Sequence, residues 1–169
     1  MANSNLNVEI EKKYTIHNLP IDYKNYPCRH IVQGYLCVNP VVRVRQDNDE
    51  YYLTYKGKGF EVREEYNLPL NASAFHELLP KANGNIISKN RYCIPYSYLS
   101  CGNTTENVTI ELDIFEAPFE NLCFAEVEFE SKKQADEFIP PEWFKDDVTT
   151  DKQYSNSNLS RMDLSNPCF

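Results

Sequence analysis

The feature that most constrains this chain is a series of β-strand candidates with charges on one face and apolar side chains on the other. Successive side chains of a strand point to opposite faces, so an alternating sequence gives a strand two chemically different surfaces. In residues 8–16, VEIEKKYTI, the charged residues Glu9, Glu11 and Lys13 share one face. All but one of the strand candidates between residues 8 and 130 carry such a charged face. A fold for this chain must therefore place many charges on one side of a sheet.

The charges are also sorted by sign from strand to strand. The candidates at residues 41–46, 51–58 and 86–94 carry basic residues on this face, whereas those at 108–115 and 123–130 carry acidic ones. An ordinary half-exposed strand mixes Thr, Ser and Gln into its polar face, and such mixing is nearly absent here. The acidic members of the stripes are Glu9, Glu11, Glu61, Glu65, Glu111, Asp113, Glu126, Glu128 and Glu130, and the basic members are Lys13, Arg43, Arg45, Lys56, Lys58, Arg63, Lys89 and Arg91.

The order of the elements predicts an α+β domain that is mainly β, with antiparallel strands. The strands follow one another as hairpins, interrupted by short helical segments. Asn71 and Ser131 are suited to cap two of these segments, and a last helix is expected from Asp151, capped by Thr149 or Thr150. The length fits a single domain over residues 1–169.

Two architectures fit the stripes. In a sandwich, the apolar faces form the core and the charges face water; in a closed barrel, the charges line a tunnel and helices cover the apolar outside. A charged tunnel cannot be dry, because an unpaired buried charge is very unfavourable. Lys and Arg would neutralise a polyphosphate, and the carboxylates would hold Mg²⁺ or Mn²⁺ beside it. The pattern by itself leaves both architectures open.

The overall charge limits the partners of the chain. The formal net charge of −8 argues against non-specific binding to nucleic acid or to an anionic membrane surface. No apolar run approaches the ~20 residues of a transmembrane helix, and the N-terminal MANSNLN lacks the features of a secretory signal. We therefore expect a cytoplasmic protein with six reduced cysteines.

A set of short motifs resembles the CYTH superfamily, the triphosphate tunnel metalloenzymes, and looks closest to its short, single-domain bacterial branch. The resemblance runs from about Val8 to Leu159, with the motifs in family order. The motifs are Glu9-Ile10-Glu11-Lys12-Lys13, Gln33-Gly34-Tyr35, Arg43-x-Arg45, Leu53-Thr54-Tyr55-Lys56-Gly57, Arg63-Glu64-Glu65-Tyr66, Lys89-x-Arg91-Tyr92, Glu111-Leu112-Asp113, Glu126-Val127-Glu128-Phe129-Glu130, Glu142-Trp143-Phe144 and Asp151-Lys152-Gln153-Tyr154-Ser155-Asn156.

The resemblance implies an eight-stranded antiparallel closed barrel with a charged lumen and a few peripheral helices. It also implies metal-dependent chemistry on triphosphates, by in-line attack of water on a terminal phosphoryl group. The residues that match the family's triphosphate-binding positions are Lys13, Arg43, Arg45, Lys56, Arg63, Lys89, Arg91 and Lys152. Those that match metal-binding positions are Glu9, Glu11, Glu126 and Glu128, with Asp113 and Glu111 in support.

Catalytic roles are expected for Tyr35 and Lys89, which match a tyrosine–lysine pair of the family, and for Glu111 or Glu9 as the base. The expected activity is hydrolysis of inorganic tripolyphosphate to pyrophosphate and phosphate, and of nucleoside triphosphates as further substrates. The alternatives are a class IV-type adenylyl cyclase, a thiamine triphosphatase and a non-catalytic polyphosphate-binding module. Homodimers are the commonest assembly for such domains, and the sequence does not specify one.

Overall fold

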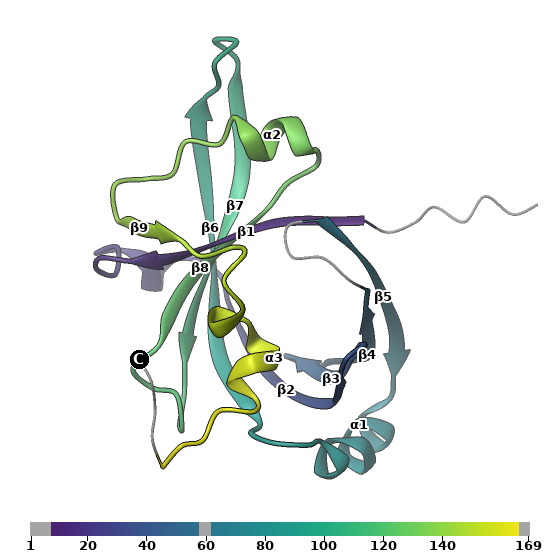
Figure 1. Ribbon diagram of the computed structural model, residues 1–169. Helices are drawn as coiled ribbons and strands as arrows, with labels where there is room; N and C mark the ends of the chain where they lie inside the picture. Colours follow the sequence, from purple (N-terminus) through teal and green to yellow (C-terminus); the bar gives the residue numbers. More distant parts are fainter. Residues whose placement is uncertain (1–7, 58–61, 166–169) are drawn as a thin grey trace, which may run out of the picture.

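The computed structural model describes residues 8–57 and 62–165, and it omits the side chains of Val8, Val62 and Arg63 (Figure 1). In this range the chain forms one antiparallel sheet in the order β5-β4-β3-β2-β6-β7-β8-β1-β9. The strands are β1 (Val8–Ile16), β2 (Cys28–Val38), β3 (Val41–Asp47), β4 (Glu50–Lys56), β5 (Val62–Leu70), β6 (Ile87–Leu99), β7 (Thr105–Phe115), β8 (Cys123–Glu128) and β9 (Phe144–Asp147). The prediction of a mainly β, antiparallel fold is confirmed.

The helical segments are short and lie outside the sheet. They are α1 (Ala72–Leu78), α2 (Lys132–Asp136) and α3 (Asn156–Leu159), with 3₁₀ turns η1 (Tyr23–Asn25), η2 (Leu79–Lys81) and η3 (Lys152–Tyr154). Asn71 caps α1 and Ser131 caps α2, as predicted, each through its side-chain oxygen. The predicted last helix is different: Asp151 caps η3 and Ser155 caps α3, so neither Thr149 nor Thr150 begins it. None of the helices in the described residues is long and apolar enough to cross a lipid bilayer.

Strand β1 connects parts of the sheet that are far apart in strand order. It pairs with β8 from Glu11↔Glu128 to Tyr14↔Ala125, and its first residues pair with β5 from Val8↔Glu64 to Ile10↔Val62. Strands β2 to β5 curve around the space next to β1 (Figure 1).

The described residues form nine strands where eight were predicted. The additional strand, β9, pairs with the end of β1. β6 and β7 stay paired as far as Leu99↔Thr105, so the connection between them is short. A closed ring of eight strands remains a prediction.

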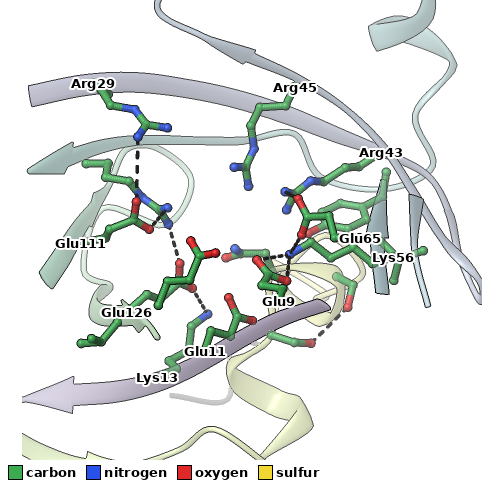
Figure 2. A pocket seen from close by; sticks show the side chains of 18 residues that line it. Glu9, Glu11, Lys13, Arg29, Arg43, Arg45, Lys56, Glu65, Glu111 and Glu126 are labelled. Carbon is green, nitrogen blue, oxygen red and sulfur yellow. Dashed lines mark hydrogen bonds and ion pairs between the residues drawn. The ribbon is translucent and has the colours of Figure 1, made fainter. Parts of the chain in front are cut away.

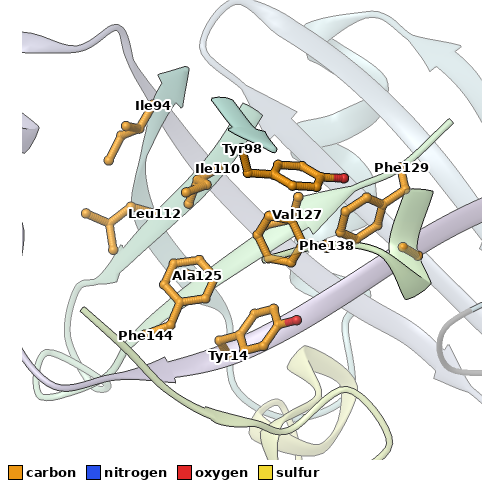
Figure 3. Close-up of a cluster of buried hydrophobic side chains, with 11 residues drawn as sticks. Tyr14, Ile94, Tyr98, Ile110, Leu112, Ala125, Val127, Phe129, Phe138 and Phe144 are labelled. Carbon is orange, nitrogen blue, oxygen red and sulfur yellow. The ribbon is translucent and has the colours of Figure 1, made fainter. Parts of the chain in front are cut away.

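The larger of the two hydrophobic clusters lies on the outer, uncharged faces of the strands. Leu112 on β7 and Ala125 and Val127 on β8 are fully buried there (Figure 3). Phe138, which follows α2, packs its ring edge-on against Phe129 at 5.2 Å between centroids. The charged faces point the other way, so the structure matches the arrangement with charges inside and not the sandwich with charges in water.

Gly34 in β2 marks a close approach between the sheet and the segment after α1. A Cβ atom at this position would lie 2.7 Å from Ala82 Cβ and 2.9 Å from Leu79 Cδ1, too close for any side chain. Gly34 therefore marks a close contact between β2 and this segment. The five described cysteines, Cys28, Cys37, Cys93, Cys101 and Cys123, are free thiols.

Candidate functional site

The charged faces of the strands enclose a cavity of about 250 Å³ (Figure 2). Strands β1 to β8 all contribute side chains to its wall, and α3 closes part of it. The charged residues of the lining are Glu9, Glu11, Lys13, Arg29, Arg43, Arg45, Lys56, Glu65, Arg91, Glu111, Glu126 and Glu128, and the uncharged ones are Tyr35, Val41, Val127, Ser155, Asn156 and Ser157.

Two arginines of β3 form the basic side of the cavity. Arg43 and Arg45 alternate with Val44, so both point inward, and both are buried with 4% and 7% of their surfaces exposed. Arg43 Nη2 lies 3.9 Å from Glu65 Oε1, and Arg43 Nε has no hydrogen-bond partner among the described residues. Arg45 donates to the amide oxygen of Gln33 from Nε at 2.9 Å and from Nη2 at 2.7 Å.

Lys56 of β4 joins the basic side to two carboxylates. Its Nζ lies 2.7 Å from Glu9 Oε2 and 2.5 Å from Glu65 Oε2. Although burial acts to raise it, the positive charges of Lys56 and Arg43 hold the pKa of Glu65 at about 2. This group therefore stays ionised over the whole physiological range.

A buried ion-pair network lies in the wall formed by β6, β7 and β8. Arg91 donates to Asp113 Oδ1 from Nε and to Asp113 Oδ2 from Nη2, both at 2.7 Å, and Asp113 also accepts a bond from Lys89. Arg91 Nη2 lies 2.5 Å from Glu126 Oε2, and Nη1 contacts Glu111. Burial, with the charge of Arg91 beside it, lowers the pKa of Lys89 to about 8.

The opposite side of the cavity is acidic. Burial raises the pKa of Glu128, and the negative charges of Glu9, Glu111 and Glu11 add to this effect. Glu126 behaves differently: burial acts to raise its pKa, but Lys13, Lys89 and Arg91 hold it well below its usual range. Carboxylate oxygens are the ligands that Mg²⁺ and Mn²⁺ prefer, and a cation would relieve the repulsion around Glu128. The donor set therefore fits a divalent cation, although the described residues contain no group of three or more His, Cys, Asp or Glu side chains already converged on one point.

The structure brings most of the predicted site residues into this cavity or its wall. Lys13 lies 2.8 Å from Glu126 and donates to the Tyr154 carbonyl at 3.0 Å, which joins β1 to η3. Lys89 and Asp113 lie behind the lining, with essentially no exposed surface. The predicted residues in the wall or lining are Glu9, Glu11, Lys13, Tyr35, Arg43, Arg45, Lys56, Lys89, Arg91, Glu111, Asp113, Glu126 and Glu128.

Some predicted residues lie elsewhere. Lys152 is exposed on η3 and does not line the cavity. The Arg63 side chain, Lys58 and Glu61 lie outside the described residues, although the backbone of Arg63 pairs with Glu9. Tyr35 and Lys89 are both buried, but in the described residues no hydrogen bond joins them; the Tyr35 hydroxyl instead accepts from Gln33 at 3.4 Å.

Sequence reasoning missed Arg29 and Asp47, and it gave Gln33, which it named only within a motif, no role in the site. Arg29 lines the cavity and its Nε donates to Asp47 Oδ1 at 2.9 Å. β2 begins at Cys28, so the alternation that places Tyr35 inside also places Arg29 and Gln33 there. Asp47 is the last residue of β3 and is buried.

Comparisons with known proteins agree with this fold. The inorganic triphosphatase of Nitrosomonas europaea is 35% identical over 156 residues, covering 90% of this chain and 96% of that protein. The inorganic triphosphatase of Acetivibrio thermocellus is 33% identical, covering 89% and 92%. The crystal structure of an inorganic triphosphatase matches with a TM-score of 0.61 at 32% identity, covering 90% of this chain and 93% of that one.

A family model described as the CYTH domain matches residues 39–158, which is most of the sequence. The matched region contains the arginines of β3, the buried network of β6 and β7, and the acidic residues of β8. On the family match and the similarity to these relatives, the chain belongs to the CYTH domain family.

Proposed function

We propose that this protein is a divalent-metal-dependent triphosphatase that hydrolyses inorganic tripolyphosphate to pyrophosphate and phosphate. The observation that carries the proposal is a cavity with two buried arginines on one side and crowded carboxylates on the other. Such a cavity suits a compact polyanion that binds together with a cation. The names of the similar proteins, both inorganic triphosphatases, support the same activity.

We infer that β1 to β8 act as one closed tunnel wall, with β9 outside the ring. The pairing of β1 with both β5 and β8 supports this inference. A closed wall would separate the substrate from bulk water on its flanks. Electrostatic interactions inside such a wall are stronger than in solvent. The domain would extend over residues 1–169.

The metal would be Mg²⁺ or Mn²⁺, held by Glu9, Glu11, Glu126 and Glu128. Asp113 would support them by holding Arg91 and Lys89 in place, since both of its oxygens already accept bonds from these residues. When bound, a divalent cation supplies charge neutralisation and Lewis-acid polarisation of phosphoryl oxygens.

The residues of the chain would do the rest by positioning and charge neutralisation. Arg43 and Arg45 would grip phosphate oxygens from one side, and Arg91, oriented by Asp113, from the other. The carboxylate of Glu111 or of Glu9 would accept the proton of the attacking water. Tyr35 and Lys89 remain predicted participants in this step. The further predicted phosphate ligands are Lys13, Lys56, Arg63 and Lys152.

The partner is proposed to be a small-molecule triphosphate. The net charge of −8 disfavours nucleic acid and anionic membranes as partners. A cytoplasmic location and a homodimeric assembly remain predictions.

Turnover of separate triphosphates tests the proposal. The protein is incubated with Mg²⁺ or Mn²⁺ and with tripolyphosphate, ATP or thiamine triphosphate, and the products are identified. Pyrophosphate and phosphate from tripolyphosphate are expected. Cyclic AMP from ATP would refute the proposal in favour of a cyclase, preferential cleavage of thiamine triphosphate would favour that hydrolase, and no turnover at all would favour a binding module.

Two variants connect the activity to the cavity. Glu128→Gln is expected to abolish metal-dependent turnover, because it removes a carboxylate from the acidic side. Arg43→Ala is expected mainly to weaken triphosphate binding, with a raised KM. Unchanged activity of Glu128→Gln would refute the metal assignment.

A further inference from the structure

Gln33 is a fully buried residue of the cavity wall with 0% of its surface exposed. It lies on β2 directly opposite Arg45 on β3, and opposite Ile87 on β6. Its amide oxygen accepts two hydrogen bonds from Arg45, at 2.9 Å and 2.7 Å. A guanidinium has only donors, so the amide must turn its oxygen toward it. These two bonds fix the orientation of the guanidinium of Arg45.

The chemistry of this partner sets Arg45 apart from the other cations of the site. Carboxylates pair closely with most of them: Glu126 with Lys13, Asp47 with Arg29, Glu9 with Lys56, and Asp113 with both Lys89 and Arg91. Arg43 has a looser carboxylate partner, Glu65, at 3.9 Å. In the part of the chain that the structure describes, no carboxylate forms an ion pair with Arg45. Its partner is a neutral amide.

A neutral partner has a definite electrostatic consequence. A carboxylate would orient Arg45 and also cancel its charge, whereas an amide orients it and leaves the charge uncompensated. Burial lowers the pKa of Arg45, and the positive charge of Arg43 adds to this effect. Arginine nevertheless stays protonated in proteins. The unliganded protein therefore carries a buried, oriented positive charge without a direct ion-pair partner at this point of the cavity, although Asp47 lies near enough to feel this charge.

The surrounding structure keeps Gln33 in place. β2 is hydrogen-bonded on both sides, to β3 and to β6, at the position of this residue. The next residue, Gly34, packs so closely on Ala82 that the strand has no room to shift outward. The amide of Gln33 also donates to the Tyr35 hydroxyl at 3.4 Å. Its orientation toward Arg45 is thus set by the fold.

We propose that Gln33 is a positioning residue for triphosphate binding, whose neutral amide aims Arg45 into the cavity and leaves its full charge for a phosphate group. This inference rests on the proposed function. It accounts for an amide at a place where every neighbouring cation has a carboxylate. A glutamate here would form a stronger ion pair and stabilise the empty protein, but it would compete with the substrate for Arg45.

The variant Gln33→Glu tests this trade-off with almost no change of size. Binding of inorganic tripolyphosphate is measured by calorimetry with a chelator present, so that no divalent cation supports hydrolysis, and Tm is measured without ligand. The Kd of the variant is expected to rise by about tenfold or more, because a negative charge is added a few ångströms from the bound anion. The Tm of the unliganded variant is expected to rise. A purely structural role would not move these two quantities in opposite directions.

Gln46→Glu is the matched control. Gln46 follows Arg45 on β3, points to the outer face, and donates to the Asn48 carbonyl at 2.9 Å. The variant has the same change in net charge, but its new charge lies on the solvent side, where it is screened. Its Kd for tripolyphosphate is expected to stay within about twofold of the wild-type value.

The outcomes separate this inference from the proposed function. If the wild-type protein neither binds tripolyphosphate with the chelator present nor hydrolyses it with Mg²⁺ or Mn²⁺, the proposed function is refuted, and the inference with it. If the wild-type protein hydrolyses tripolyphosphate but binds it too weakly without metal to be measured, KM replaces Kd, and an unchanged KM of Gln33→Glu overturns the inference. If the wild-type protein binds and Gln33→Glu binds equally tightly, only the inference is overturned. Should Gln33→Glu fail to fold, Gln33→Met removes both hydrogen bonds without adding a charge. It is expected to raise KM more than it lowers kcat, and an unchanged KM would overturn the inference.

Discussion

Replacing Asp113 by Asn tests the buried ion-pair network, because it removes one charge at nearly constant shape. Asp113 has no exposed surface, and its two oxygens accept bonds from Arg91 and Lys89. In the variant, Lys89 loses the carboxylate that it contacts, while Arg91 keeps Glu126 and Glu111. The unliganded, metal-free protein should therefore become substantially less stable.

The size of the effect follows from the burial of the network. Removing one partner of a buried ion pair typically costs about 3–5 kcal/mol, since the other charge stays buried without compensation. Because Arg91 retains two carboxylates, we expect a loss near the lower limit, about 3 kcal/mol. For a domain of this size that corresponds to a decrease in Tm on the order of 10 °C. Natural domains of about 5–15 kcal/mol stability survive such a loss, so the variant should fold at 25 °C.

The assay is urea unfolding with a chelator present, with the exposed pair Lys132–Asp136 as control. Asp136→Asn makes the same chemical change in an exposed i, i+4 pair with a 2.9 Å contact, and should change the unfolding free energy by less than about 0.5 kcal/mol. If Asp113→Asn changes the stability of the metal-free protein no more than this control, the role of Asp113 as the anchor of Lys89 and Arg91 is wrong, and a role confined to metal binding is favoured.

Three further perturbations follow from the structure. Glu128→Gln should raise the urea midpoint of the metal-free protein, because burial and neighbouring carboxylates raise the pKa of Glu128 and so disfavour its charged form. A lower midpoint would contradict the inference that repulsion among these carboxylates destabilises the metal-free protein. Because the pKa of Lys89 in the folded state is about 8, below its ordinary 10.5, the folded protein releases this proton before the unfolded chain does. The contribution of Lys89 to the unfolding free energy should therefore rise with pH between about 8 and 10.5, while the affinity for tripolyphosphate falls. Lys89→Met should lose both trends. Identical pH profiles of the wild-type protein and Lys89→Met would refute this assignment. Gly34→Ala should lower the unfolding free energy measured in urea by about 1–3 kcal/mol, because its Cβ would lie 2.7 Å from Ala82 Cβ. Gly102→Ala, whose Cβ would have its nearest neighbour at 3.9 Å, should lower the unfolding free energy by less. Equal losses in the two variants would show that the close contact at Gly34 does not determine the cost.

The period-two pattern predicted much of the site because it depends only on local geometry. Lys89 and Arg91 on β6 are two residues apart in the sequence, as are Glu111 and Asp113 on β7, and all four share the inner face in the structure. The sorting of charge by strand likewise indicated a cavity that could hold both a polyanion and a cation.

The residues that sequence reasoning missed depend on strand limits and on register. Arg29 and Asp47 lie at the ends of strands, where an error of one or two residues removes them from the pattern. The pairing of Gln33 with Arg45 requires the register between β2 and β3, which no periodicity within one strand determines. Glu130 continues the acidic alternation of residues 123–130, but β8 ends at Glu128 and the backbone of Glu130 turns to donate to Gln134. Lys152 depends on how the C-terminal segment packs, which is a tertiary property.

A crystal structure with tripolyphosphate and Mn²⁺ tests the central claim most directly, with data collected at the manganese absorption edge. Slow-turnover conditions or the Glu111→Gln variant would preserve the substrate. We predict phosphate oxygens within hydrogen-bond distance of Arg43 and Arg45, and a manganese anomalous peak bounded by Glu9, Glu11 and Glu128. A phosphate chain outside the cavity, or a manganese peak away from these carboxylates, would contradict the account.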